Sequence, residues 1–135
     1  MVFCAPLGAQ QEVRLWHAMS GSLGDVLDSQ IERYNASQTL VRVVPEHKGG
    51  YERTMIEALA AQRDGKGPHL VQVFEVGTAQ MMAARTAVRP LWQVLAEGGQ
   101  RIETKSFLPA VAGYFSDGAG RLVALPFNLD RKSVV

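Results

Sequence analysis

The sequence has no excess of charge of either sign and no long hydrophobic run. It holds 14 Lys and Arg residues against 13 Asp and Glu residues, and its formal net charge is +1. This balance excludes the strongly basic surface that is typical of nucleic-acid-binding domains and offers no polybasic patch for a membrane surface. No stretch approaches the roughly 18 apolar residues that a membrane-spanning helix needs. From the balanced charge we expect no nucleic-acid partner.

Cysteine is nearly absent as well, because Cys4 is the single one and an internal disulfide is excluded. It lies in the opening stretch MVFCAPLGAQQ, which is apolar first and rich in small residues afterwards. Such a stretch is typical of the end of a secretory signal peptide, with a cleavage point after Ala9, although the basic start of a signal peptide is missing. We interpret residues 1–10 as a leader remnant, and an unstructured N-terminus is the alternative.

The motifs of several enzyme classes are also missing. The sequence has no G-x-S-x-G nucleophile elbow, no Walker loop and no G-x-G-x-x-G dinucleotide turn. No His is followed by a second His or a carboxylate at a spacing that favours a metal site. We expect no cofactor, no metal and no catalysis by this chain.

What the sequence does contain is an alternation of strand-like and helix-like segments. Apolar residues make up 47% of the chain, as in an ordinary globular protein. Period-two stretches predict strands, and apolar residues at helical spacing predict helices. The expected strands cover residues 12–19, 39–50, 68–74 and 121–128, and the expected helices cover residues 20–37, 51–67, 77–88, 91–99 and 105–117. This order predicts an α/β fold with a mostly parallel sheet flanked by helices.

Several residues are typical of helix ends. Ser20 or Ser22 is the expected N-cap of the first helix, and Thr78 is a candidate cap of the third. Gly65 and Gly67 are expected to end the second helix. Pro90 is expected in the first turn of the fourth helix.

Glu75 is the most unusual charged residue, because it stands between an apolar strand and an apolar helix in LVQVFEVGTAQMMA. A lone buried charge is costly, so its position needs a partner or an exposed edge. In open α/β sheets ligands bind at the carboxyl ends of strands, where Glu75 is expected to lie. An ionised carboxylate can accept hydrogen bonds from two neighbouring hydroxyl groups of a ligand. A general base and a cap for the following helix are the alternatives.

Three further residues are candidates for the same edge. Tyr51 follows two glycines that permit close backbone approach, and its ring suits a sugar-like or polyol ligand. Trp16 and His17 end the first strand and could form a wall of a binding site. The alternative is that Tyr51 packs in the core on Met55, and that Trp16 and His17 are a core or edge pair.

Five stretches together resemble one protein family: LWHAMSGSLGDVLDSQIERYN, VVPEHKGGYERT, LVQVFEVGTAQMMA, FLPAVAGYFSD and ALPFN. The combination is similar to the extracellular solute-binding proteins of ABC importers, a family related to maltose-binding protein. The resemblance covers about Val13 to Asn128 and implies the N-terminal part of a type II periplasmic-binding-protein lobe. The stretches are specific for this family only in combination, and no single one of them would establish the resemblance.

The resemblance also implies a function. Members of this family are periplasmic monomers that trap a small polar ligand between two lobes and deliver it to ABC transporter permease subunits. The stretches quoted above imply glycerol-3-phosphate or a related glycerophosphodiester as the ligand. Tyr51 and Glu75 match family residues that contact the glycerol part of the ligand.

Two departures from the family matter. Family members are much longer than this chain. The second lobe and most phosphate contacts would come from the part of the family's sequence that this chain lacks. After PFN the sequence reads LDRKSVV, which puts Asp130 at a ligand contact where an acid would repel a phosphate ester. We interpret residues 11–128 as a partial lobe and residues 129–135 as a tail unrelated to the family.

Two other functions stay open from the sequence. One is a related oligosaccharide-binding protein, because sugar binders share this lobe. The other is a fragment of an α/β enzyme that uses Glu75 as a general base with His17 nearby.

Overall fold

The computed structural model describes residues 10–84 and 86–128. The chain divides into two compact units, Met1–Gln72 and Val73–Val135, and each unit is described by itself. The expected leader with Cys4, and the tail with Asp130, lie outside the described residues. Within the described part of the chain, no helix is both long enough and apolar enough to span a membrane.

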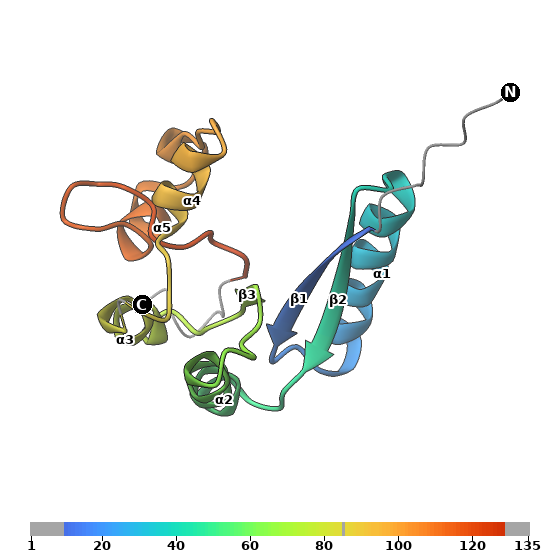
Figure 1. Ribbon diagram of the computed structural model, residues 1–135. Helices are drawn as coiled ribbons and strands as arrows, with labels where there is room; N and C mark the ends of the chain where they lie inside the picture. Colours follow the sequence, from blue (N-terminus) through green and yellow to red (C-terminus); the bar gives the residue numbers. More distant parts are fainter. Residues whose placement is uncertain (1–9, 85, 129–135) are drawn as a thin grey trace, which may run out of the picture. The chain divides into compact units, whose positions relative to one another are not determined.

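The sheet of the first unit has three parallel strands. These are β1 (Gln11–His17), β2 (Val41–His47) and β3 (Leu70–Val71), arranged in the order β2-β1-β3 (Figure 1). β1 and β2 are paired along their whole length, from Gln11 opposite Val41 to His17 opposite His47. The expected α/β class with a parallel sheet is confirmed.

β3 is shorter than the strand expected over 68–74. Its ladder with β1 covers only Leu70 and Val71, although two further backbone bonds flank it. The His69 N–H donates to the Arg14 carbonyl over 3.0 Å, and the Gln72 N–H donates to the Trp16 carbonyl over 2.8 Å. The apolar run continues beyond this point, but its later residues belong to the second unit and leave the strand.

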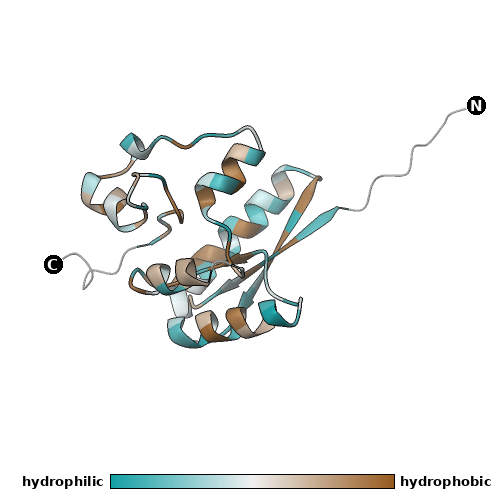
Figure 2. Cartoon of the chain, turned by 60° about the vertical axis from the view of Figure 1, so that its left-hand side comes forward, coloured by the Kyte–Doolittle hydropathy of each residue, from teal (hydrophilic) through white to brown (hydrophobic). Residues whose placement is uncertain are grey.

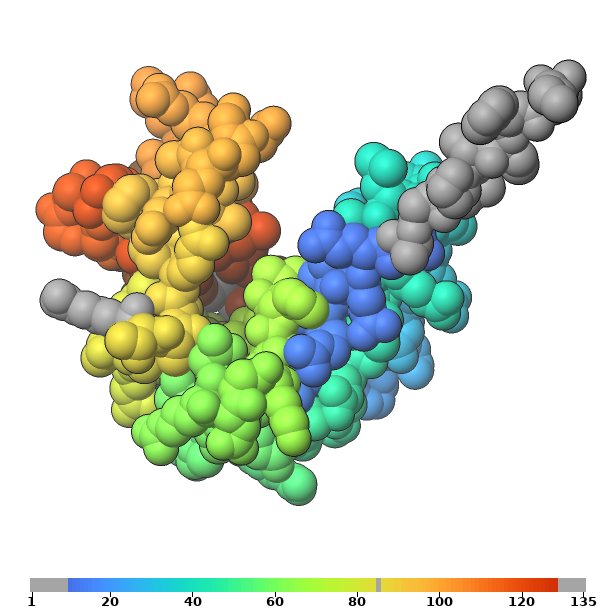
Figure 3. Space-filling view, viewed as in Figure 1, coloured from blue at the N-terminus to red at the C-terminus, as the bar shows by residue number. Residues whose placement is uncertain are grey.

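Helix α1 (Gly21–Ser37) packs on the sheet through one narrow stripe. Leu27 and Ile31 are buried together with Met19, and Leu15 of β1 and Val43 of β2 pack against them. Hydrophobic and hydrophilic residues alternate along the helices and strands (Figure 2), as expected of elements with one buried face. The first residues of β1 are exposed at the surface (Figure 3, blue).

The two ends of α1 differ in the side-chain hydrogen bonds that hold them. Ser20 is the N-cap residue, as expected, although its side chain makes no capping hydrogen bond. Near the other end, the Asn35 side chain donates to the Val43 carbonyl and accepts from the Val43 N–H, both over 2.8 Å. This two-way bond ties the last turns of α1 to β2.

Helix α2 (Tyr51–Arg63) starts after Gly50 as expected, but it ends four residues before the expected boundary at residue 67. Thr54, Met55 and Ala58 are its buried residues. Gly65 follows with a φ of 68°, a left-handed conformation that glycine adopts without strain. Gly65 therefore lies just past the end of the helix, as expected, whereas Gly67 does not have a left-handed conformation.

The second unit consists of short helices: α3 (Gly77–Ala83), α4 (Leu91–Glu97), the 3-10 helix η1 (Thr104–Ser106) and α5 (Pro109–Tyr114). The expected third and fifth helices are thus shorter than 77–88 and 105–117. Pro90 is the N-cap residue of α4 and lies one position before its first turn. Thr78 is not a cap, because Val76 holds that position and Thr78 is buried inside α3.

The expected strand over 121–128 is wrong. Only an isolated antiparallel bridge between Ser116 and Leu122 forms there. The backbone of this segment bonds inside the second unit instead: the Trp92 N–H donates to the Leu122 carbonyl, and the Val123 N–H donates to the Phe115 carbonyl. These bonds use the groups that a sheet ladder would need, and Pro126 has no N–H to offer.

Candidate ligand-binding site

The carboxyl ends of β1 and β2 meet at one edge of the first unit. His17 and His47 lie opposite each other in the ladder, and their ring centroids are 5.7 Å apart. The chain continues from His47 to Lys48, whose N–H donates to the His17 carbonyl over 2.9 Å. Because the strands are parallel, this edge is where an α/β sheet presents ligand-binding groups.

Trp16 is a buried platform at this edge rather than an open wall. It is 7% exposed, and the Nζ atom of Lys48 lies 3.9 Å from the centroid of its ring. The Lys48 ammonium also forms an ion pair with Glu46. Trp16 and His17 are successive strand residues and so face opposite sides of the sheet. The structure therefore brings them to one edge, but with their side chains on different faces.

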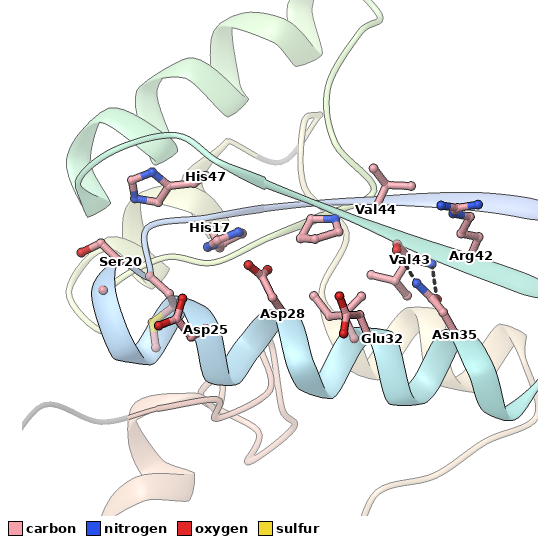
Figure 4. A pocket seen from close by; sticks show the side chains of 15 residues that line it. His17, Ser20, Asp25, Asp28, Glu32, Asn35, Arg42, Val43, Val44 and His47 are labelled. Atoms are coloured by element: carbon pink, nitrogen blue, oxygen red, sulfur yellow. Dashed lines mark hydrogen bonds between the residues drawn. The ribbon is translucent and has the colours of Figure 1, made fainter.

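His17 faces an open groove of about 590 Å³ between α1 and the β1–β2 pair (Figure 4). The side chain is 4% exposed, and its Nδ1 atom has no hydrogen-bond partner among the described residues. Burial lowers the pKa of His17 below its ordinary value, and His47 lowers it further. Asp28, which points from α1 towards His17 in Figure 4, and the backbone of Met19 act in the opposite direction.

The groove does not suit a phosphate ester. Three carboxylates of α1, those of Asp25, Asp28 and Glu32, line it, against the single guanidinium of Arg42. An anionic ligand would face net repulsion from these groups. The carboxyl ends of the strands therefore suit an anionic ligand better than this groove does.

Gln72 is a residue of this edge that the sequence analysis missed. It follows β3, is buried, and its Oε1 atom accepts from the Ala18 N–H over 2.9 Å. Its Nε2 atom lies 3.1 Å from the sulfur of Met19. Gln72 thus holds the loop between β1 and α1, and a lone glutamine in an apolar run is the signal that could have found it.

Tyr51 is the first residue of α2 and is half-buried. It follows Gly49, which has a φ of 92°, and Gly50, the N-cap residue. An added Cβ at Gly50 would meet no atom within 4 Å, so the space beside this glycine is open. The expected position of Tyr51 after a glycine pair, at the start of a helix, is confirmed.

Glu75 belongs to the second unit, where it lies in a turn two residues before α3. Its carbonyl accepts from the Thr78 N–H over 3.2 Å. The N-cap position of α3 makes no side-chain hydrogen bond, and the Glu75 carboxylate makes none to the described residues. Both carboxylate oxygens are therefore available as acceptors, which a ligand with neighbouring hydroxyl groups could use.

The described residues contain no group of three or more His, Cys, Asp or Glu side chains that could hold a metal ion. Within residues 10–84 and 86–128, the pair formed by His17 and His47 has no third ligand of this kind. Within the first unit, the carboxyl ends of β1 and β2 thus carry aromatic rings and are followed by the Tyr51 hydroxyl at the start of α2.

Comparison with known proteins identifies relatives that match most of this chain. The chain is 43% identical over 129 residues to the sn-glycerol-3-phosphate-binding periplasmic protein UgpB of Yersinia pestis, which covers 95% of this chain and 29% of that protein. It is 42% identical over 117 residues to the protein of the same name from Escherichia coli K12, which covers 86% of this chain and 26% of that protein. Over most of its length this chain is similar to proteins named as sn-glycerol-3-phosphate-binding periplasmic proteins. No protein-family profile matches it.

Two solved structures show the same fold. One is the cyclic α-maltosyl-1,6-maltose-binding protein of Arthrobacter globiformis, with a TM-score of 0.66, 20% identity, and coverage of 83% of this chain and 27% of that chain. The other is CpMnBP1 with mannotriose bound, with a TM-score of 0.65, 22% identity, and coverage of 84% and 27%. The chain spans less than a third of the length of the sn-glycerol-3-phosphate-binding proteins and of these structures.

Proposed function

We propose that this chain is a segment of the solute-binding component of an ABC importer that captures sn-glycerol-3-phosphate or a glycerophosphodiester in the periplasm. The observation that carries the proposal is the 43% identity, over 95% of the chain, to proteins named for sn-glycerol-3-phosphate binding. The captured solute would pass to the permease subunits, and the binding protein would act as a monomer. The chain itself would perform no catalysis and use no cofactor.

Tyr51 and Glu75 are the proposed ligand contacts. Tyr51 offers a phenolic hydroxyl and an aromatic face at the start of α2. Glu75 offers two carboxylate oxygens that accept no hydrogen bond from the described residues. A glycerol group carries neighbouring hydroxyls, which a carboxylate binds through charge-assisted hydrogen bonds. Trp16 and His17 would support the site, the first as a platform and the second beside the groove.

The segment is proposed to be only part of the binding site. The match covers 95% of this chain but only 29% of the Yersinia pestis protein, so that protein is more than three times as long. Affinity in a two-lobed protein comes from contacts on both sides of the cleft and from the exclusion of water. We propose that residues 11–128 supply one side, and that the remaining contacts come from sequence that is not present here.

The experiment uses the product of the full reading frame that encodes this segment, called the full-length protein below. Calorimetry compares sn-glycerol-3-phosphate, glycerophosphocholine and maltose as ligands. A micromolar or tighter dissociation constant for a glycerol phosphate ligand supports the proposal. Binding of maltose alone would favour an oligosaccharide-binding protein, and binding of none of the three would refute the proposed function.

The same reading frame tests the proposed class. Permease and ATPase genes next to it would agree with an importer. A complete catalytic domain in the same frame would instead favour the enzyme alternative, with Glu75 as the general base.

A further inference from the structure

Lys48 is tied to the end of β1 through both its backbone and its side chain. Its N–H donates to the His17 carbonyl over 2.9 Å, and its Nζ atom lies 3.9 Å from the centre of the Trp16 ring. The ion pair with Glu46 holds the ammonium from the other side. Only 19% of the Lys48 side chain is exposed, so these contacts are partly shielded from water. A shielded ammonium on an indole ring is a stronger contact than an exposed one.

The link from Lys48 to Tyr51 consists of two glycines. Glycine has the widest backbone freedom of all residues, and Gly49 uses it with a φ of 92°. The course of this link is therefore set by the residues that anchor its two ends. Lys48 is the anchor on one side.

The anchor on the other side is Thr54, which is completely buried in α2. Its backbone N–H and its hydroxyl both donate to the Gly50 carbonyl, over 2.9 and 3.0 Å. Tyr51 follows Gly50 directly, so its backbone position depends on both anchors.

We propose that Lys48 is a positioning residue that acts on ligand binding through Tyr51. The inference rests on the proposed function, in which Tyr51 contacts the ligand. A neutral side chain at position 48 would lose the contact with Trp16 and leave Glu46 without its cation. At position 48 the glycine link would then be held by the backbone bond to the His17 carbonyl alone, so Tyr51 would be less well ordered before the ligand binds, which weakens affinity.

The first test measures the affinity of the full-length protein for sn-glycerol-3-phosphate by calorimetry. Lys48→Met keeps the length of the side chain and removes its charge, whereas Lys48→Arg keeps the cation over the ring. We expect Lys48→Met to weaken binding about three- to tenfold, the size expected of a partly shielded cation–π contact. Lys48→Arg should stay within about twofold of the wild type. Equal affinity of Lys48→Met and the wild type would overturn the proposal.

The second test asks whether the effect passes through Tyr51. Residues that act through one another show non-additive effects in a double-mutant cycle. We expect Lys48→Met to change affinity by less than about twofold when Tyr51 is already alanine. The same loss in both backgrounds would mean that Lys48 acts directly on the ligand, and would overturn a role through Tyr51.

A matched control exists in the second unit. The guanidinium carbon of Arg121 lies 3.9 Å from the centre of the Trp92 ring, and Arg121 forms an ion pair with Asp117. Arg121→Met therefore removes a contact of the same kind and length from another part of the chain. Its affinity should equal that of the wild type. An equal loss in both variants would show a general effect of lost cation–π contacts and would overturn the proposal.

A measurement without ligand separates this inference from the proposed function. Hydrogen–deuterium exchange over residues 48–54 should be faster in Lys48→Met than in the wild type, slow again in Lys48→Arg, and unchanged in Arg121→Met. Unchanged exchange in Lys48→Met would refute the anchoring role even if the protein binds its ligand. A wild-type protein that binds no glycerol phosphate would refute the proposed function, while the exchange rates still test the anchor.

Discussion

The replacement Gln72→Leu tests how the edge of the first unit is held together. In the wild type the buried Gln72 side chain accepts from the half-buried Ala18 N–H over 2.9 Å. Leucine has a similar volume but no acceptor, so the Ala18 N–H would lose its partner. A buried donor left unsatisfied costs about 1–3 kcal/mol, and the lower end of this range applies to the half-buried Ala18 N–H. The contact of the Gln72 amide with the sulfur of Met19 is weaker and adds little.

Thr54→Val is the matched comparison, because it also removes one hydrogen bond from a buried side chain. The Gly50 carbonyl loses the Thr54 hydroxyl but keeps the bond from the Thr54 backbone N–H. No acceptor is left unsatisfied, so we expect a loss of only about 0.5–1 kcal/mol. Gln72→Leu should therefore destabilise the protein more than Thr54→Val does.

The assay is urea unfolding of the full-length protein without ligand, followed by circular dichroism. The free energy of unfolding should fall while the dependence on urea concentration stays constant, as expected when stability alone changes. A cost below about 0.5 kcal/mol for Gln72→Leu, or a larger cost for Thr54→Val, would refute the argument from unsatisfied groups.

Three further predictions concern the proposed site residues. Glu75→Gln should weaken sn-glycerol-3-phosphate binding by about 1–3 kcal/mol in calorimetry and leave the unliganded melting temperature unchanged, whereas a lower melting temperature with intact affinity would identify a helix cap. Tyr51→Phe should reduce affinity modestly and Tyr51→Ala more strongly, and equal affinities would mean that Tyr51 is only a core residue. Because burial and His47 lower the pKa of His17 despite Asp28, the neutral imidazole favours folding, so stability should fall as the pH drops below about 6.5. Urea unfolding of His17→Gln should show a shallower fall over this range, and an identical pH dependence would exclude His17 as the cause.

The first unit could be predicted from the sequence because its periodic patterns are long. The strands expected over 12–19 and 39–50 correspond to β1 and β2, and the helix expected over 20–37 corresponds to α1. Alternating and helical patterns of this length leave little ambiguity about the element. Gly65 marked the end of α2 because glycine alone tolerates the left-handed conformation at that position.

The second unit was harder to predict because its segments are short and their bonding depends on tertiary contacts. The apolar stretch over 121–128 has the composition of a strand, but the Leu122 and Val123 carbonyls accept from the start of α4 instead. Composition indicates which residues prefer a pleated surface and says nothing about which partner is within reach. Thr78 is of a residue type that often caps helices, but Val76 holds the N-cap position and α3 already begins at Gly77.

The contacts that hold the proposed site together were not visible in the sequence for a related reason. Lys48 and Trp16 are far apart in the chain, and they meet only because β1 and β2 are paired in a register that ends at His17 and His47. A shift of one residue would move Lys48 away from the ring and turn its neighbours to the other face. The register in turn depends on the core that Leu15 shares with α1.

The position of Tyr51 is thus linked to the packing of the whole first unit. The core sets the register of β1 and β2, the register places Lys48 over Trp16, and the glycine link transmits that position to the start of α2. A ligand contact that is held before the ligand arrives costs less ordering entropy on binding. Substitutions in the core of the first unit should therefore weaken binding even where they leave Tyr51 itself unchanged, provided that they shift the register or loosen the Lys48 anchor.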